Sequence, residues 1–192
     1  MATDLFGAPL PSLPGLAYRE DIVTAEEEAA LVAIVDAAGL TPFRFQGWLG
    51  KRLTTSFGWR YDFDDASFGP TEPIPDWLSA ARERAATFAG LGVADLVQVL
   101  LTRYDPGAGI GWHRDRPVFD QVIGISLGHP AILRFRRRRE GGFDRVSVPV
   151  APRSVYHLSG EARRIWEHSI AETAITRWSI TFRTLSEKAR SI

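Results

Sequence analysis

Hydrophobic and polar positions divide the chain into a helical first part and a strand-rich second part. Thr24 and Glu27 have the spacing of a capping box, which starts a helix by satisfying two free backbone N–H groups. Apolar residues then recur at helical intervals, and Gly39 marks the stop; they are Leu31, Ile34, Val35 and Ala38. A second helix is predicted from Asp76, just after Pro75, to Gly90. Its predicted buried residues are Leu78, Ala81, Ala85 and Phe88.

From Val97 onward the pattern changes to short strand-like runs separated by Gly and Pro turns. The predicted strands are Val97–Tyr104, Gln121–Leu127, Ala131–Arg138, Arg145–Val150, Ser154–Leu158 and Arg177–Thr184. Helices followed by six closely spaced strands predict a mainly β domain of the α+β class. Its expected core is an antiparallel barrel or sandwich with helical support.

The organisation expected for residues 1–192 is a single domain with three parts. Residues 1–17 are rich in Pro, Gly and Leu and predict an N-terminal arm. Residues 43–63 are aromatic and basic, and the stretch from Arg52 to Phe63 is expected to form a hairpin or an ordered lid. Residues 97–185 supply the β core.

Composition narrows the possible classes of function. Apolar residues make up 45% of the chain and charged residues 24%, as in an ordinary globular protein. The sequence has no apolar run of membrane-spanning length and no basic–apolar leader at its start. It has no cysteine, which excludes a thiolate nucleophile, a cysteine-type zinc site and a disulfide framework. We expect a cytoplasmic monomer with no membrane partner.

The charge balance argues against tight, non-specific binding of nucleic acid, because the formal net charge is zero. Arginine is nevertheless concentrated in one segment that contains Arg134 and the run 136–139. This segment is either a solvated hairpin strand or an edge that contacts phosphates.

The candidate metal ligands begin with His113 and Asp115, which point the same way if the chain between them is extended. The third ligand must come from elsewhere in the chain. His129 lies in a Gly–Pro turn and is expected to be exposed, whereas His157 and His168 both remain candidates. Two imidazoles and one carboxylate, without cysteine, fit iron(II), or manganese(II) as a substitute, with open coordination positions. The alternative is a surface His–Asp pair and an unrelated, hydrogen-bonded histidine.

The strand from Arg177 to Arg183 alternates between polar and apolar residues. An ordinary half-buried strand would turn the polar face, which also holds Ser179 and Thr181, toward water. The alternative is functional. Two arginines six residues apart leave room between their guanidinium groups for a five-carbon dicarboxylate, and their planar forks suit carboxylates.

Four blocks of the sequence together resemble the AlkB family of iron(II)- and 2-oxoglutarate-dependent dioxygenases. These blocks are Phe57-Gly58-Trp59-Arg60-Tyr61-Asp62-Phe63, Thr102 to Gly109 leading into His113-Arg114-Asp115, Ser159-Gly160-Glu161-Ala162-Arg163 leading into His168, and Arg177 to Arg183. The resemblance covers about two thirds of the chain, from Arg52 to Leu185.

The resemblance implies a double-stranded β-helix, or jelly-roll, core and a set of site residues. His113, Asp115 and His168 would be the catalytic iron(II) ligands, with O2 and 2-oxoglutarate as co-substrates. Co-substrate contacts would come from Tyr104, Thr102, Arg177, Ser179 and Arg183. Thr102 and Ser179 depart from the family, which has asparagine at both positions, and their side chains are shorter.

For the substrate, the resemblance implies oxidative demethylation or dealkylation of alkylated DNA or RNA, a repair-like reaction in which the target base is flipped into a pocket. Lid positions that would contact it are Trp59, Arg60, Tyr61 and Arg52, although Trp59 and Tyr61 could instead serve packing alone. Arg52 stands where repair enzymes have a stacking tryptophan, for which Trp48 could substitute. Pro117 replaces an acidic residue that reads the base. The alternatives are a protein or other non-nucleic-acid substrate, or a non-catalytic jelly-roll binding protein.

Overall fold

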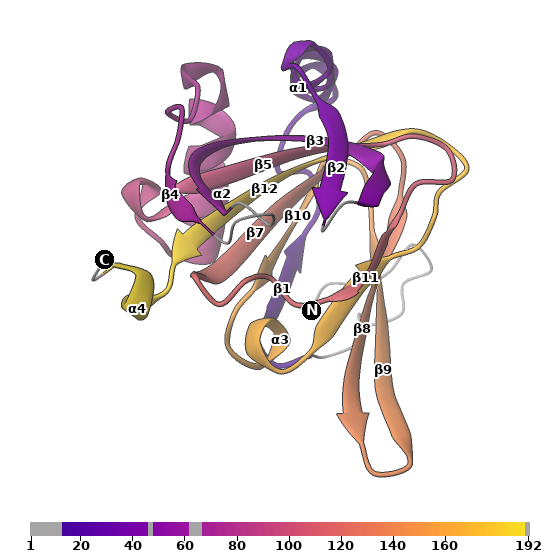
Figure 1. Ribbon diagram of the computed structural model, residues 1–192. Helices are drawn as coiled ribbons and strands as arrows, with labels where there is room; N and C mark the ends of the chain where they lie inside the picture. The colour runs from indigo at the N-terminus through magenta and orange to yellow at the C-terminus, as the bar shows by residue number, and fades with distance from the viewer. Residues whose placement is uncertain (1–12, 46–47, 62–66, 191–192) are drawn as a thin grey trace.

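Two antiparallel β-sheets face each other and form a double-stranded β-helix, with helices packed outside the larger sheet (Figure 1). The computed structural model describes residues 13–45, 48–61 and 67–190, without the side chains of Phe45, Trp48 and Tyr61. Most of the predicted arm and the end of the predicted lid therefore lie outside the described residues. The predicted fold class, mainly β with supporting helices, is confirmed.

The larger sheet has the strand order β1-β10-β7-β12-β5-β3-β2, and β4 pairs with β3. Its strands are β1 (Leu16–Arg19), β2 (Thr41–Phe45), β3 (Trp48–Tyr61), β4 (Phe68–Pro70), β5 (Gln98–Tyr104), β7 (Phe119–Leu127), β10 (Ser154–Leu158) and β12 (Arg177–Leu185). The smaller sheet has the order β6-β11-β8-β9. Its strands are β6 (Ile110–His113), β8 (Ala131–Arg139), β9 (Gly142–Val150) and β11 (Glu167–Ile170). All six predicted strands are present.

The two predicted helices are also present. Helix α1 (Ala25–Ala37) begins with the predicted capping box: Thr24 accepts from the Glu27 backbone N–H, and the Glu27 carboxylate accepts from that of Thr24. The second predicted helix begins with a 3₁₀ turn, η1 (Asp76–Leu78), before α2 (Ser79–Ala89), so its first turn is not α-helical. Short helical turns complete the set: η2 (Val93–Asp95), α3 (Gly160–Arg164) and α4 (Glu187–Arg190). None of the helices formed by the described residues has the length and apolar character needed to span a bilayer.

Strand β12 lies between β5 and β7 in the middle of the larger sheet, and both of its faces are buried. Its apolar face, with Ile180 and Phe182, packs against the core that α1 and α2 cover. Its polar face points into the space between the sheets, where Arg177 is 0% and Arg183 only 7% exposed. The alternative in which this face meets water is therefore wrong.

Three parts of the architecture differ from, or add to, the sequence prediction. Strands β6 and β11 were not predicted, and β1 occupies the end of the predicted arm. Residues 48–61 form one long strand rather than a hairpin from Arg52. Gly58 turns this strand from β5 toward β4: the pairing with β5 ends at Gly58, and the pairing with β4 begins at Trp59.

The turn at Gly58 generates a stability prediction. Gly58 has φ +84°, and an added Cβ would lie 2.0 Å from the Val97 carbonyl oxygen. We expect Gly58→Ala to lower the free energy of unfolding by about 2–4 kcal/mol, because it adds a backbone clash to the cost of a positive φ. Gly39→Ala is the matched control, since Gly39 also has a positive φ but nothing within 4 Å of the added Cβ; about 1 kcal/mol is expected there. Equal losses in urea unfolding would contradict the role given to Gly58.

Candidate metal and co-substrate site

Strand pairing brings together the three predicted metal ligands. His113 ends β6, His168 lies on the neighbouring strand β11, and the two residues are direct partners in the ladder. Their ring centroids are 4.3 Å apart. Asp115 follows two residues after His113, and one ligand atom from each of the three residues lies within 4.8 Å of the others.

The two other histidines lie elsewhere. His157 is on β10, next to Tyr156 and on the opposite face of that strand, and its Nε2 lies 2.7 Å from the Gln121 Oε1 atom. His129 is partly exposed, and its Nδ1 lies 2.9 Å from the Pro130 carbonyl oxygen. Of the two candidates for the third ligand, the structure therefore brings His168, and not His157, beside His113 and Asp115.

The donor atoms of the three ligands fit a divalent cation. Asp115 Oδ1 accepts hydrogen bonds from Arg183, whose Nε and Nη2 lie 3.0 and 2.8 Å away. Asp115 Oδ2 is buried and has no hydrogen-bond partner among the described residues. His113 Nδ1 lies 2.9 Å from the Gly111 carbonyl oxygen, which can only accept, so the lone pair is on Nε2. This hydrogen bond orients the ring as in other metal-ligating histidines.

The electrostatics give these groups the protonation states that a metal requires. Burial opposes ionisation of Asp115, but the positive charge of Arg183, with smaller contributions from His168 and His113, outweighs it and holds the pKa of Asp115 well below its usual range. Burial, reinforced by His113, lowers the pKa of His168 to about 3. At neutral pH the carboxylate is therefore ionised and the His168 imidazole is neutral.

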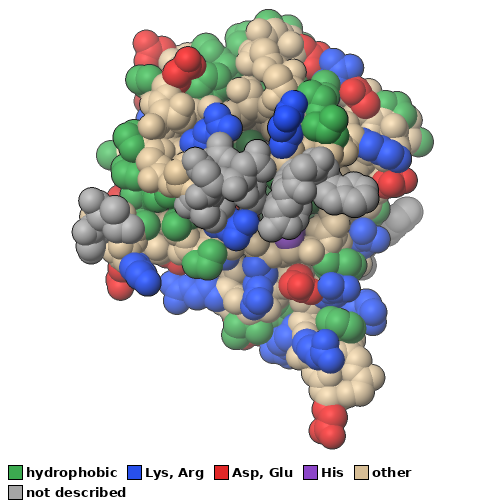
Figure 2. Space-filling model, viewed as in Figure 1, with side chains coloured by type: hydrophobic (Ala, Val, Ile, Leu, Met, Phe, Trp, Pro, Cys, Tyr) green, Lys and Arg blue, Asp and Glu red, His purple; other side chains and the backbone are tan. Residues whose placement is uncertain are grey.

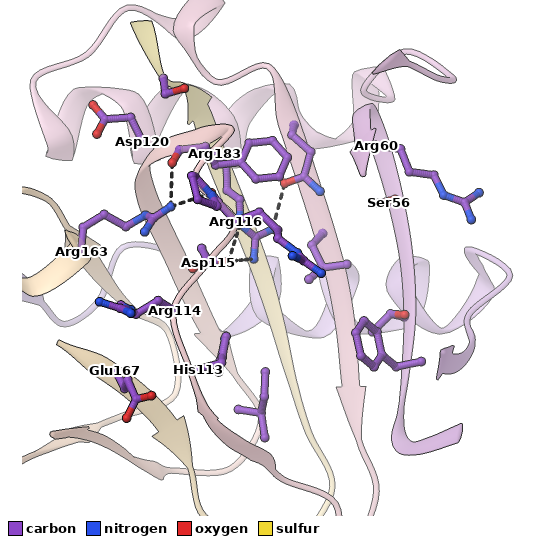
Figure 3. Close-up of a pocket in the computed structure, with 18 of the residues that line it drawn as sticks. Ser56, Arg60, His113, Arg114, Asp115, Arg116, Asp120, Arg163, Glu167 and Arg183 are labelled. Atoms are coloured by element: carbon purple, nitrogen blue, oxygen red, sulfur yellow. Dashed lines mark hydrogen bonds and ion pairs between the residues drawn. The ribbon is translucent and has the colours of Figure 1, made fainter. Parts of the chain in front are cut away.

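Two supporting residues were not identified from the sequence. Arg163, on α3, donates from Nη2 to the carbonyl oxygens of Arg116 and Phe119, at 2.9 and 2.6 Å, and so fixes the loop after Asp115 (Figure 3). Gln98 accepts from Arg183 Nη1 at 2.8 Å. The sequence signal for Arg163 is its place in the Ser-Gly-Glu-Ala-Arg block. No pattern marked Gln98.

The predicted co-substrate residues lie together on the inner face of the larger sheet. Arg177 is fully buried, donates from Nη2 to Ser126 Oγ at 3.0 Å, and has its Cζ 4.8 Å from the centroid of the Tyr104 ring. Its Nε and Nη1 atoms have no hydrogen-bond partner among the described residues. Thr102 and Ser179 are cross-strand partners and are buried as well. Two buried, unpaired guanidinium N–H groups suit a carboxylate ligand.

The predicted substrate residues fall into different places. Arg52 and Arg60 line the cavity beside the metal ligands, and the Arg52 Cζ lies 3.7 Å from the centroid of the Phe43 ring. Trp59 is not among the described residues that line it. Instead, Trp59 packs on Phe68 with ring centroids 5.0 Å apart, which favours the packing alternative. The side chains of Tyr61 and Trp48 lie outside the described part. Pro117 lines the cavity.

The cavity has a volume of about 1500 Å³ and is strongly basic. Nine basic and four acidic side chains line its described part, an excess of five positive charges in a chain whose net charge is zero. Figure 2 shows Lys and Arg side chains gathered around a hollow on this face and toward the β8–β9 hairpin. The basic lining residues are Arg44, Arg52, Arg60, Arg114, Arg116, Arg163, Arg164, Arg183 and Lys188.

Comparison with known families and structures agrees with this geometry. The model of the 2OG-Fe(II) oxygenase superfamily matches residues 45–183. The solved structure of OsALKBH1 superposes with a TM-score of 0.65 at 17% identity, covering 92% of this chain and 100% of that one.

Characterised relatives include both AlkB and ALKBH8 proteins. The tRNA (carboxymethyluridine(34)-5-O)-methyltransferase alkbh8 of Xenopus tropicalis is 30% identical over 83% of this chain and 26% of its own length. The alkylated DNA repair protein ALKBH8 homolog of Arabidopsis thaliana is 28% identical over 86% of this chain and 53% of its own. The chain thus spans about a quarter to a half of these relatives. The alpha-ketoglutarate-dependent dioxygenase AlkB of Escherichia coli is 27% identical over 81% of this chain and 83% of its own length.

The geometry predicts which histidine variant loses metal. We expect His168→Ala to weaken manganese(II) binding about 100-fold or more, because it removes one of three ligands, whereas His157→Ala should bind like the wild type. Titration calorimetry without oxygen measures both. Comparable losses in the two variants, or none in His168→Ala, would contradict the assignment.

Proposed function

Because this chain belongs to the 2OG-Fe(II) oxygenase superfamily and resembles its AlkB members, we propose that it is an iron(II)- and 2-oxoglutarate-dependent dioxygenase acting on alkylated nucleic acid. One observation supports this reaction above others. The Asp115 Oδ2 atom and the two imidazoles lie together, and His113 and Asp115 line a cavity that is strongly positive.

His113, Asp115 and His168 would hold the iron. The bound iron supplies the oxidation: O2 and 2-oxoglutarate yield succinate and carbon dioxide, and one oxygen atom enters a C–H bond of the substrate. Arg183 keeps Asp115 ionised and turns its Oδ1 away from the metal position. Arg177 supplies unpaired N–H groups for a carboxylate. When the substrate carbon is an N-methyl group, the hydroxylated product loses formaldehyde and leaves the free amine.

The charge of the cavity favours nucleic acid over protein as the substrate. A cluster of positive charge inside a neutral chain attracts phosphates to this one face. Arg52 strengthens this argument: burial lowers its pKa, and no described residue receives a hydrogen bond or ion pair from it. An arginine that is partly desolvated and has no counter-ion is suited to an anionic group of the substrate. The absence of cysteine fits a reducing compartment, and a cytoplasmic monomer is part of this proposal.

The reaction is tested with a panel of methylated single-stranded DNA, methylated RNA and a methylated peptide. Purified protein with iron(II), ascorbate and 2-oxoglutarate should form succinate. With at least one of the nucleic acids, it should also release formaldehyde in proportion to the succinate formed. If only the peptide releases formaldehyde, the substrate class is wrong. If no succinate forms under conditions where a control oxygenase turns over, the proposed activity is wrong.

Arg52 gives a sharper prediction about the substrate. We expect Arg52→Ala to raise the KM for the active oligonucleotide about tenfold, the cost of one charge-assisted contact, while succinate formation without substrate stays unchanged. Arg19→Ala is the matched control. Arg19 also stacks on a phenylalanine, Phe88, at 5.2 Å, but it is exposed on β1 outside the cavity. Equal KM values for the two variants would remove Arg52 from the substrate site.

A further inference from the structure

Tyr156 reaches into the space between the two arginines of β12. It lies on β10, and its partner in the ladder is Gly124 of β7, which in turn pairs with Thr181 of β12. Thr181 shares a face with Arg177 and Arg183 and lies between them, four residues from Arg177 and two from Arg183. The Tyr156 side chain therefore starts two strands away from β12, in the row between the two arginines.

Gly124 is what allows the phenol ring to cross toward β12. A Cβ added at Gly124 would lie 2.2 Å from Tyr156 Cζ and 2.4 Å from its Oη. These distances are too short for any side chain, so the tip of the ring occupies the place where residue 124 would otherwise have one. The ring itself packs in the apolar cluster that also holds Tyr104.

Tyr156 is a mostly buried residue whose hydroxyl has no partner among the described residues. The residue is 7% exposed, and its hydroxyl makes no hydrogen bond to any described residue. Burial raises the pKa of Tyr156 to about 12, with a further contribution from Tyr104, so the hydroxyl stays protonated and is a donor. A polar group without a partner gains a hydrogen bond when a ligand supplies the acceptor.

Several donors on this side of the site therefore have no acceptor among the described residues. They are the Nε and Nη1 groups of Arg177 and the Tyr156 hydroxyl, on which the positive charge of Arg177 acts. Arg183, at the other end of the row, already donates to Asp115 and Gln98. The donors available to an anionic ligand therefore lie at the end of this row of β12 residues that carries Arg177. A carboxylate can accept hydrogen bonds from an arginine and a hydroxyl at the same time.

We propose that Tyr156 is a further co-substrate-binding residue, whose hydroxyl donates a hydrogen bond to the 2-oxoglutarate carboxylate farther from the metal, which Arg177 also binds. This inference rests on the proposed function. No sequence motif pointed to Tyr156. Its hydroxyl would complement the short side chains of Thr102 and Ser179, which lie one row away in the same sheet.

The test measures 2-oxoglutarate binding without turnover. Titration calorimetry of the manganese(II)-loaded protein in the absence of oxygen should give a Kd about tenfold or more higher for Tyr156→Phe than for the wild type, the usual effect of losing a hydrogen bond to a charged group. The variant keeps its ring, so its thermal unfolding and manganese(II) affinity should match those of the wild type. A Kd within twofold of the wild-type value overturns the proposal.

Tyr18→Phe is the matched control, because Tyr18 is the β1 neighbour of Tyr156 but its hydroxyl accepts from the Ala151 backbone N–H. It should leave the Kd for 2-oxoglutarate unchanged. An equal rise in Kd in this variant would mean that any lost tyrosine hydroxyl in this sheet disturbs the site, and would overturn the specific role of Tyr156.

A second ligand identifies the carboxylate. 2-Oxopentanoate has the same chain length but lacks the carboxylate farther from the metal, so Tyr156→Phe and the wild type should bind it equally. A loss as large as that for 2-oxoglutarate would overturn the assignment to that carboxylate. If the wild type binds no 2-oxoglutarate, both the proposed dioxygenase activity and this inference are wrong. If the wild type and Tyr156→Phe bind 2-oxoglutarate equally, only the role of Tyr156 is wrong.

Discussion

The buried ion pair between Arg183 and Asp115 is the contact on which the rest of the site depends. It joins β12, in the larger sheet, to the loop that follows β6 in the smaller one, so a single interaction sets the position of the sheets at the metal ligands. It also gives the two carboxylate oxygens different roles. Oδ1 accepts hydrogen bonds from Arg183, and Oδ2 has no hydrogen-bond partner among the described residues. Removing one partner from a buried pair typically costs about 3–5 kcal/mol. The charge that orients the metal ligand therefore also holds the fold together.

A polar inner face of this kind requires the outer face to supply the hydrophobic stabilisation. Helices α1 and α2 provide it by covering the side of the sheet that carries Leu101, Ile125 and Phe182, all fully buried. The opposite side of the same strands can then carry arginines and hydroxyl residues. Strands β5, β7 and β12 of the larger sheet thus contribute one face to stability and the other to the candidate site. This division explains why an alternating strand, which usually indicates a surface, lies here in the centre of the molecule.

Local patterns predicted much of the fold, and long-range pairing determined the rest. The capping box at Thr24, the stop at Gly90 and the six alternating strands depend on neighbouring residues, so they could be identified directly from the sequence. Strands β6 and β11 have only four residues each and exist because they pair with each other and β11 pairs with β8. For the same reason the choice between His157 and His168 required the resemblance or the structure. Trp59 and Tyr156 show the remaining limit: which side of a strand meets the cavity depends on residues far away in the chain.

The uneven distribution of charge has a consequence for how a substrate would arrive. Since the chain is neutral and its cavity lining carries five excess positive charges, the remaining residues carry an equal negative excess. The molecule is therefore an electric dipole with its positive end at the reaction site. Such a field orients a polyanion before contact, so encounters would be steered toward the cavity and slowed as ionic strength rises. Neutrality overall would let the product leave without being retained elsewhere on the surface.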